Sequence, residues 1–161
     1  AATGIGVFLS ILQDNRSIQV QIQASAPLTS SPLQAEAQAL LLAAKAAQIL
    51  QVEQPTFLTN NISLAKAAAN RNVTTDSTPW VIRESLADFY RTTQHLQSQV
   101  FHISREINGI AHNVAHQVLS RSLEPVYGCF GSAHGNRTCP VVSTLSTLNL
   151  QGFVLHVVHC F

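Results

Sequence analysis

The sequence predicts an α/β fold in which a mixed sheet is flanked by helices. Three observations predict it. Residues 17–26 alternate apolar and polar side chains, which is the pattern of a half-buried strand. Residues 32–50 form an Ala- and Leu-rich run whose apolar side chains recur at helical spacing. Strand and helix patterns then alternate along the chain, and this order is typical of a layered α/β domain.

Length and composition indicate one domain with a neutral polar surface. The chain has 161 residues, of which 46% are hydrophobic and 11% charged, and its formal net charge is +1. Such a balance gives no global attraction to nucleic acid, so a nucleic-acid partner would need a local basic patch. No segment has the length of a membrane span and no signal peptide is evident, so we expect an intracellular protein without a membrane partner. Composition leaves the compartment and the oligomeric state open.

The first two elements are predicted to form an antiparallel hairpin. Residues 4–12, GIGVFLSIL, are apolar and partly β-branched, and residues 13–16 have the composition of a turn. In residues 17–26 the glutamines alternate with Ile and Val. We expect this second strand to lie at an edge of the sheet, with its glutamines facing solvent or a neighbour.

A helix is predicted to begin after Ser31. Ser31 is a good N-cap, Pro32 suits the first helical position, and Gln34 completes a capping-box pattern. We expect Glu36 to lie in the first turn of this helix. Two roles are open for Glu36: a carboxylate that complements the helix dipole, or a metal-binding or catalytic residue held close to the sheet.

The remaining elements complete the α/β order. They are a strand over 56–59, a helix over 62–70, a helix capped by Thr78 that begins at Pro79, a strand over 99–104 and a helix capped by Asn108. The apolar face of that last helix comprises Ile110, Ala111, Val114, Ala115, Val118 and Leu119. Beyond Pro125 the periodicity is lost. We therefore divide the chain into a domain over 1–122 and an irregular tail over 123–161, with one late strand expected over 153–158.

The cysteines give no disulfide framework by their spacing. Cys129, Cys139 and Cys160 are odd in number and irregularly spaced. Cys129 and Cys139 with His134 are a weak zinc hypothesis, because the short Cys-x-x-Cys hook is absent.

Four segments in order carry a resemblance to a known family. They are GIGV at 4–7, SPLQAEAQAL at 31–40, FLTNN at 57–61 and REINGIAHNVA at 105–115. Together they resemble the type 1 ribonuclease H-like domain abundant in plants, a reverse-transcriptase-like family related to retroelement enzymes. The resemblance runs from about Gly4 to Leu119.

The resemblance implies a nuclease mechanism and its residues. Family members are endonucleases that hydrolyse the RNA strand of RNA–DNA hybrids, with two Mg²⁺ ions held by four carboxylates. Glu36 matches one of these acids, and it is the one metal ligand that the resemblance retains. Asn60 and His112 stand at two Asp positions. The remaining acid lies on a first central strand that would precede Gly4, so that strand is expected to be missing from this sequence.

With one acid of four retained, we expect impaired or absent hydrolysis and doubtful Mg²⁺ binding. Histidine is a poor ligand for Mg²⁺, although His112 and His116 are spaced to bind a softer metal. One alternative is a non-catalytic module that binds nucleic acid or protein on the same scaffold. Another is an aberrant gene product without a selected role.

A missing central strand would leave unpaired backbone groups inside the sheet, which is costly. The apolar segment 151–160 is a candidate to fill that gap.

Overall fold

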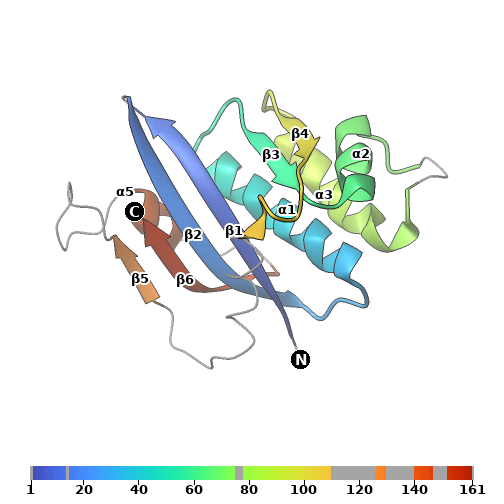
Figure 1. Cartoon of the computed structure of the whole chain (residues 1–161), viewed down its shortest axis with the longest axis horizontal. Helices are drawn as coiled ribbons and strands as arrows, with labels where there is room; N and C mark the ends of the chain where they lie inside the picture. Colours follow the sequence, from blue (N-terminus) through green and yellow to red (C-terminus); the bar gives the residue numbers. More distant parts are fainter. Residues whose placement is uncertain are drawn as a thin grey trace. The chain divides into compact units, whose positions relative to one another are not determined.

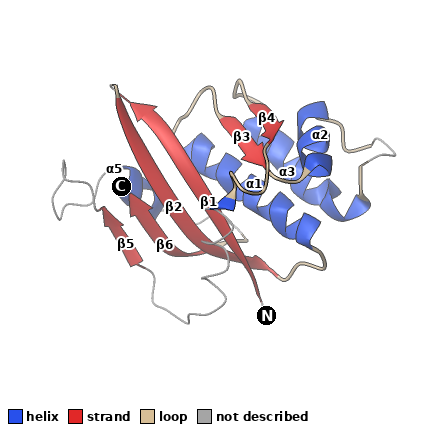
Figure 2. Ribbon diagram, viewed as in Figure 1, coloured by secondary structure: helices blue, strands red, loops and turns tan. Residues whose placement is uncertain are grey.

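The computed structural model describes most of the chain, in two compact units. The described residues are 2–13, 15–74, 78–109, 126–129, 140–146 and 152–160. One unit comprises residues 1–28 and 110–161, and the other comprises residues 29–109. Figures 1 and 2 show the helices and strands of both units.

The predicted hairpin is present in the first unit. Strands β1 (Ala2–Gln13) and β2 (Arg16–Pro27) pair antiparallel in continuous register from Ala2↔Pro27 to Gln13↔Arg16. Asn15, in the turn between them, has φ 60°. This left-handed conformation suits asparagine and is typical of tight hairpin turns. The hairpin therefore forms from local sequence signals.

The prediction that the second strand lies at an edge is wrong. The sheet order is β1-β2-β6-β5, with β5 spanning Val126–Cys129 and β6 spanning Val154–Cys160 (Figure 2). Strand β6 pairs antiparallel with β2 and parallel with β5. Strand β6 thus pairs along the edge of β2 that was expected to be free, and Gln23 on β2 is buried.

The late strand expected over 153–158 corresponds to β6, but it does not fill the gap beside the hairpin. Strand β2 separates it from β1. Among the described strands, β1 pairs only with β2. The gap-filling hypothesis is therefore wrong, and the missing central strand stays a prediction from the resemblance.

Helix α5 (Pro140–Ser146) contacts both β5 and β6. The buried apolar side chains of β2, namely Val20, Ile22, Ala24 and Ala26, recur at every second position, as its pattern predicts. The buried apolar residues of this unit's sheet and helix include Ile5, Val7, Val20, Ile22, Ala24, Ala26, Val142, Leu145, Leu155, Val157 and Val158. The predicted tail thus contains regular elements, while its boundary with a domain over 1–122 stays a prediction.

The second unit begins with helix α1 (Pro32–Ile49), whose start matches the sequence prediction. The Ser31 hydroxyl accepts a hydrogen bond from the backbone amide of Gln34 at 3.2 Å. The Gln34 side chain in turn accepts from the Ser30 amide at 2.8 Å, one residue earlier than a standard capping box. The buried residues of α1 are Ala37, Leu40, Leu41, Leu42, Ala44, Ala46 and Ala47.

Two short strands form a parallel sheet in this unit. Strand β3 (Thr56–Thr59) pairs with β4 (Gln99–His102). Helix α2 (Ile62–Asn70) follows β3 and is capped by Asn61, whose side chain accepts a hydrogen bond from the Leu64 amide at 3.0 Å. These elements lie where the sequence predicts them, except that the strand expected over 99–104 ends at His102.

The helix expected from Pro79 begins later. A 3₁₀ turn, η1 (Trp80–Ile82), has Pro79 rather than Thr78 at its N-cap, and helix α3 spans Arg83–Thr93. The backbone carbonyl of Thr78 instead accepts hydrogen bonds from Arg83 Nε at 3.2 Å and Nη2 at 3.1 Å. The long Arg83 side chain thus holds the segment that precedes the helix.

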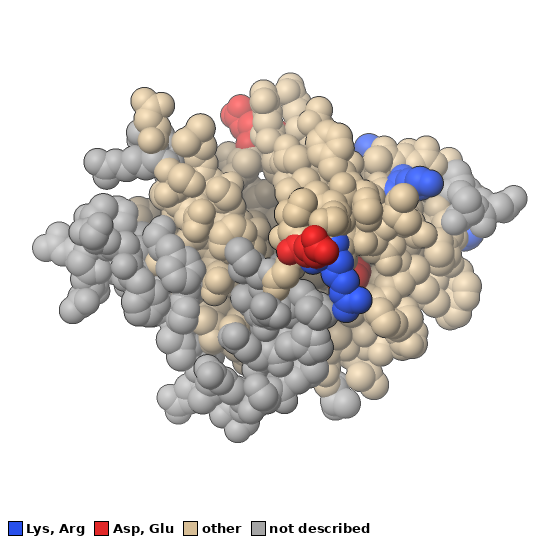
Figure 3. Space-filling view, in the orientation of Figure 1, with Lys and Arg blue, Asp and Glu red and all other residues tan. Residues whose placement is uncertain are grey.

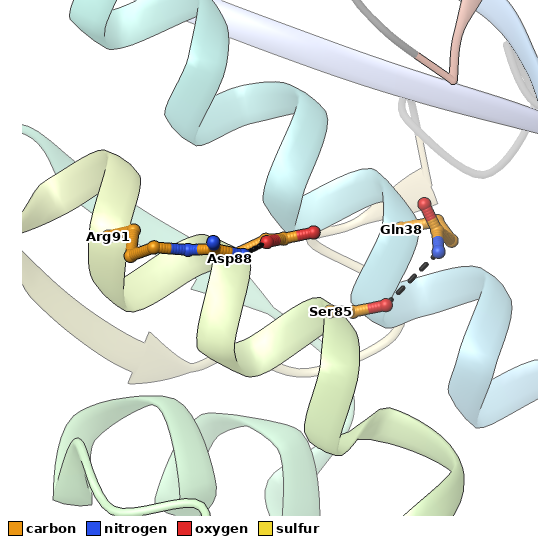
Figure 4. Close-up of polar contacts among 4 residues, drawn as sticks. All are labelled: Gln38, Ser85, Asp88 and Arg91. Carbon is orange, nitrogen blue, oxygen red and sulfur yellow. Dashed lines mark hydrogen bonds and ion pairs between the residues drawn. The ribbon is translucent and has the colours of Figure 1, made fainter.

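The core of this unit joins the sheet to helices α1 and α3. The Phe57 and Phe89 rings pack edge to face with centroids 5.3 Å apart. Gln38 Nε2 donates to Ser85 Oγ at 3.0 Å, a polar contact between α1 and α3 (Figure 4). The helix expected from Asn108 lies outside the described residues beyond Gly109. Within the described part of the chain, none of the helices is both long and apolar enough for a membrane span.

Replacing Phe89 by alanine tests this core. Phe89 is 1% exposed, so Phe89→Ala should lower the free energy of unfolding by about 3–5 kcal/mol. Trp80 is 80% exposed, so the matched variant Trp80→Ala should change it by about 0.5 kcal/mol or less. Urea unfolding of both variants measures the difference, and similar losses would contradict the packing described.

Candidate functional site

Two of the three candidate site residues lie in the unit over 29–109. Glu36 is on α1 and Asn60 directly follows β3. His112 lies outside the described residues, as does His116, its expected partner for a softer metal, and as do His134 and Cys139 of the zinc hypothesis. The described part of the candidate site therefore consists of Glu36, Asn60 and the residues near them.

The parallel pairing of β3 and β4 creates the edge at which Asn60 lies. Thr59 is in register with His102, so the chain leaves both strands at the same end of the sheet. The Ile103 amide donates to the Thr59 carbonyl at 2.9 Å and extends the pairing beyond β4. Ligand sites in α/β proteins commonly lie at the carboxyl ends of parallel strands.

Asn60 is half-buried at this end and offers an amide where the resemblance expects an Asp. Its neighbour Asn61 has a separate structural task, because it caps α2. The Asn61 amide also donates to Thr59 Oγ1 at 3.2 Å. Of the two adjacent asparagines, Asn60 is therefore the one available for a site. Its carbonyl oxygen can contact a cation or a hydrogen-bond donor, but it carries no negative charge.

Glu36 is not the capping acid that one reading of the sequence allowed. Helix α1 begins at Pro32, so Glu36 is its fifth residue, and no acidic residue lies in the first turn. The expectation that Glu36 lies in the first turn is therefore wrong. The N-cap contacts come from Ser31 and Gln34 instead. The helix start therefore gives Glu36 no capping role, and its role at the site stays a prediction.

The protonation of Glu36 reflects its half-buried position. Burial raises the pKa of Glu36 above its usual value of 4.5, because an ionised carboxylate loses hydration there. The positive charge of Arg105 lowers the pKa of Glu36 and partly offsets burial. Arg105 follows β4, so it belongs to the same end of the sheet as Asn60. Arg105 is thus within electrostatic range of the Glu36 carboxyl, and its segment and Asn60 follow the same end of the two-stranded sheet.

These residues do not fit a site for two Mg²⁺ ions. Such a site needs several carboxylate oxygens to balance the charge of the metals. Among the described residues, no group of three or more His, Cys, Asp or Glu side chains could hold a metal. Arg105 adds positive charge beside the one candidate carboxylate, which further disfavours a cation.

The arginines of α3 are engaged within the chain. Arg83 binds the Thr78 carbonyl, and Arg91 forms an ion pair with Asp88 one helical turn away (Figure 4). The spacing of Arg83 and Arg91, two helical turns apart, would also suit contacts to a phosphate backbone, but both side chains have these partners within the chain. On the face shown in Figure 3, Lys and Arg are sparse and intermixed with Asp and Glu.

One polar pair escaped the sequence reasoning. Ser25 Oγ on β2 and His156 Nε2 on β6 share a hydrogen bond. The two residues are 131 positions apart, so no local signal could have found them. A serine beside a histidine is half of a nucleophile–base arrangement, which also needs a group that orients the histidine. The Ser25–His156 hydrogen bond therefore links the side chains of two neighbouring strands, β2 and β6.

Comparison with known proteins agrees with this architecture. A family model described as reverse transcriptase-like matches residues 1–118. The structure is similar to ribonuclease H1 from the halophilic archaeon Halobacterium salinarum, with 15% sequence identity and a TM-score of 0.50. That alignment covers 73% of this chain and 98% of the archaeal one.

A second solved structure is a foamy viral protease-reverse transcriptase in complex with an RNA/DNA hybrid. It is 18% identical with a TM-score of 0.45, and the match covers 73% of this chain and 20% of the viral one. Among curated proteins no significant match is found. The likeness to the archaeal structure confirms the predicted α/β fold of the ribonuclease H type.

The raised pKa of Glu36 predicts a pH-dependent gain in stability for Glu36→Gln. Above the raised folded pKa the wild-type chain must bury a charge, and this penalty disappears below pH 4.5, where the carboxyl is protonated in both folded and unfolded chains. Glu36→Gln should therefore be more stable than wild type at pH 7 and equal to it at pH 4.

Urea unfolding at both pH values measures this effect, with Glu53→Gln as the control at an exposed carboxylate. A gain of the same size at pH 7 and pH 4 would show that charge burial is not its cause.

Proposed function

We propose, since the chain belongs to the reverse transcriptase-like family and has the ribonuclease H-like fold, that it is a nucleic-acid-binding domain for RNA–DNA hybrids in which metal-dependent hydrolysis is impaired. The observation that carries the impairment is Asn60 at the carboxyl end of β3, where the resemblance puts an acid. This combination suits a pseudoenzyme descended from a retroelement-related nuclease.

Charge supports the impairment at two positions. An amide at Asn60 removes a full negative charge from the end of the sheet. Glu36 resists ionisation because it is half-buried, so its own charge is costly to maintain. Two-metal hydrolysis depends on carboxylates that hold both ions against their mutual repulsion. With these two positions weakened, we expect the hybrid to bind without efficient cleavage.

Charge also limits how the hybrid is held. The net charge of +1 supplies little long-range attraction, and strong electrostatic binding to a duplex requires many Lys or Arg contacts to phosphates. Arg105 lies beside the site and is exposed, so its guanidinium can reach a phosphate. We therefore expect a modest affinity for the hybrid. It depends on few phosphate contacts and declines only shallowly as the salt concentration rises.

A non-catalytic protein-binding module is the second candidate, and one observation favours it. Leu58 and Phe101 are register partners on β3 and β4, and they are 52% and 51% exposed. Two large apolar side chains side by side on an exposed sheet face are more typical of a macromolecular contact than of a free surface.

A cleavage assay tests the impairment. Wild type incubated with a labelled RNA–DNA hybrid and Mg²⁺ or Mn²⁺ should give no more product than Glu36→Ala. Robust cleavage by wild type that Glu36→Ala abolishes would contradict the proposal.

Restoring acids should restore metal affinity. The double variant Asn60→Asp/His112→Asp should bind Mn²⁺ at least about tenfold more tightly than wild type in calorimetry, because two carboxylates join Glu36. The matched double variant Asn61→Asp/His116→Asp adds the same charge at neighbouring positions and should gain much less. Equal gains would show that Asn60 and His112 are not at a metal site.

Binding of the hybrid distinguishes the two candidates. Fluorescence anisotropy with a labelled hybrid in EDTA should show saturable binding by wild type that weakens only shallowly with added salt and is weaker in Arg105→Ala. The exposed Lys66→Ala on α2 serves as the charge-matched control. If wild type does not bind the hybrid, the nucleic-acid proposal fails and the protein-binding module is favoured.

A further inference from the structure

Two of the three cysteines occupy directly opposed positions of neighbouring strands. Strands β5 and β6 are parallel, and their register pairs Val126 with Val157 at one end and Cys129 with Cys160 at the other. We propose that Cys129 and Cys160 form a reversible disulfide that locks β5 to β6, independently of any activity on nucleic acid.

The register places the two backbones at the right separation. Neighbouring strands lie about 4.8 Å apart. Residues joined by a disulfide usually have Cα atoms about 4.4–6.8 Å apart, so opposed positions in adjacent strands fall within this range. Opposed residues of a parallel pair also belong to the same face of the sheet. The backbone register therefore brings the two positions within the Cα range of a disulfide.

The position in the sheet gives the bond a task. In the described part of the sheet, β5 is paired with β6 alone, while the opposite edge of β6 is held by β2, with Val20 in register with Cys160. A bond between Cys129 and Cys160 would attach the terminal strand of the sheet covalently to a strand that is paired on both sides. It would also close the loop of chain that contains α5, which restricts the unfolded state.

The chemistry requires an oxidant, and a small-molecule disulfide such as oxidised glutathione is sufficient. One thiolate attacks a glutathione sulfur, forms a mixed disulfide and releases one glutathione thiol. The second cysteine thiolate then attacks the protein sulfur of the mixed disulfide, forms the Cys129–Cys160 bond and releases the second glutathione thiol. The two protein thiols lose two electrons and two protons, and the oxidant gains them.

Burial determines when this exchange takes place. Cys160 is 2% exposed, so glutathione reaches it poorly in the folded chain. We therefore expect slow oxidation of the native protein and faster oxidation during refolding, before β6 is covered.

Peptide mapping tests the pairing in the full chain. The protein is refolded in a glutathione redox buffer, alkylated in denaturant and digested without reductant. Mass spectrometry should find a peptide pair that joins Cys129 to Cys160, and Cys139 should carry the alkyl group. The chain has three cysteines, so the titratable thiols should fall from three to one.

Variants separate this bond from other pairings. Cys139→Ser should form the same intramolecular bond, whereas Cys129→Ser should not form a bond to Cys160. When the oxidised and reduced forms of Cys139→Ser are compared, the oxidised form should unfold at the higher urea concentration. Three free thiols under these conditions, a bond that includes Cys139, a disulfide-linked dimer, or equal midpoints would each overturn the proposal.

Discussion

The parallel pairing of β3 with β4 is the interaction on which the candidate site depends. Strands separated by two helices in the chain are brought together by a few backbone hydrogen bonds, continued beyond β4 by the bond from Ile103 to Thr59. This pairing assigns Asn60 and the segment leading to Arg105 to one end of the sheet. Phe57 of β3 packs on Phe89 of α3, and this contact holds the two-stranded sheet against the helix.

The elements whose signals are local can be predicted from the sequence. The start of α1 follows from Ser31 and Pro32, and the β1–β2 hairpin follows from alternation on both sides of a short turn. The pairing of β2 with β6 could not be predicted, because it joins segments more than a hundred residues apart with no periodic signal to link them. The late start of α3 could not be predicted either. Thr78 is a residue type that commonly caps helices, but here it is buried and precedes a 3₁₀ turn.

The residues of the candidate site could be predicted from the sequence, but their burial and electrostatic surroundings could not. The resemblance selected Glu36 and Asn60 by their positions, and both lie in the same compact unit. It said nothing of the field of Arg105 or of the burial that raises the pKa of Glu36, because both arise from segments that meet only in the folded chain. His112 lies outside the described residues, so its place at the site stays a prediction.

The uncharged first strand has a consequence for handling the protein in solution. Residues 2–13 contain neither a charged side chain nor a proline, and among the described strands β1 is paired along one side only. Natural edge strands usually carry lysine, proline or a bulge that prevents further strands from adding to them. In the part of the chain that the structure describes, β1 has no such protection, so it is a template for other extended chains. Concentration-dependent self-association, beginning at β1, is therefore the expected failure of this protein during purification and storage.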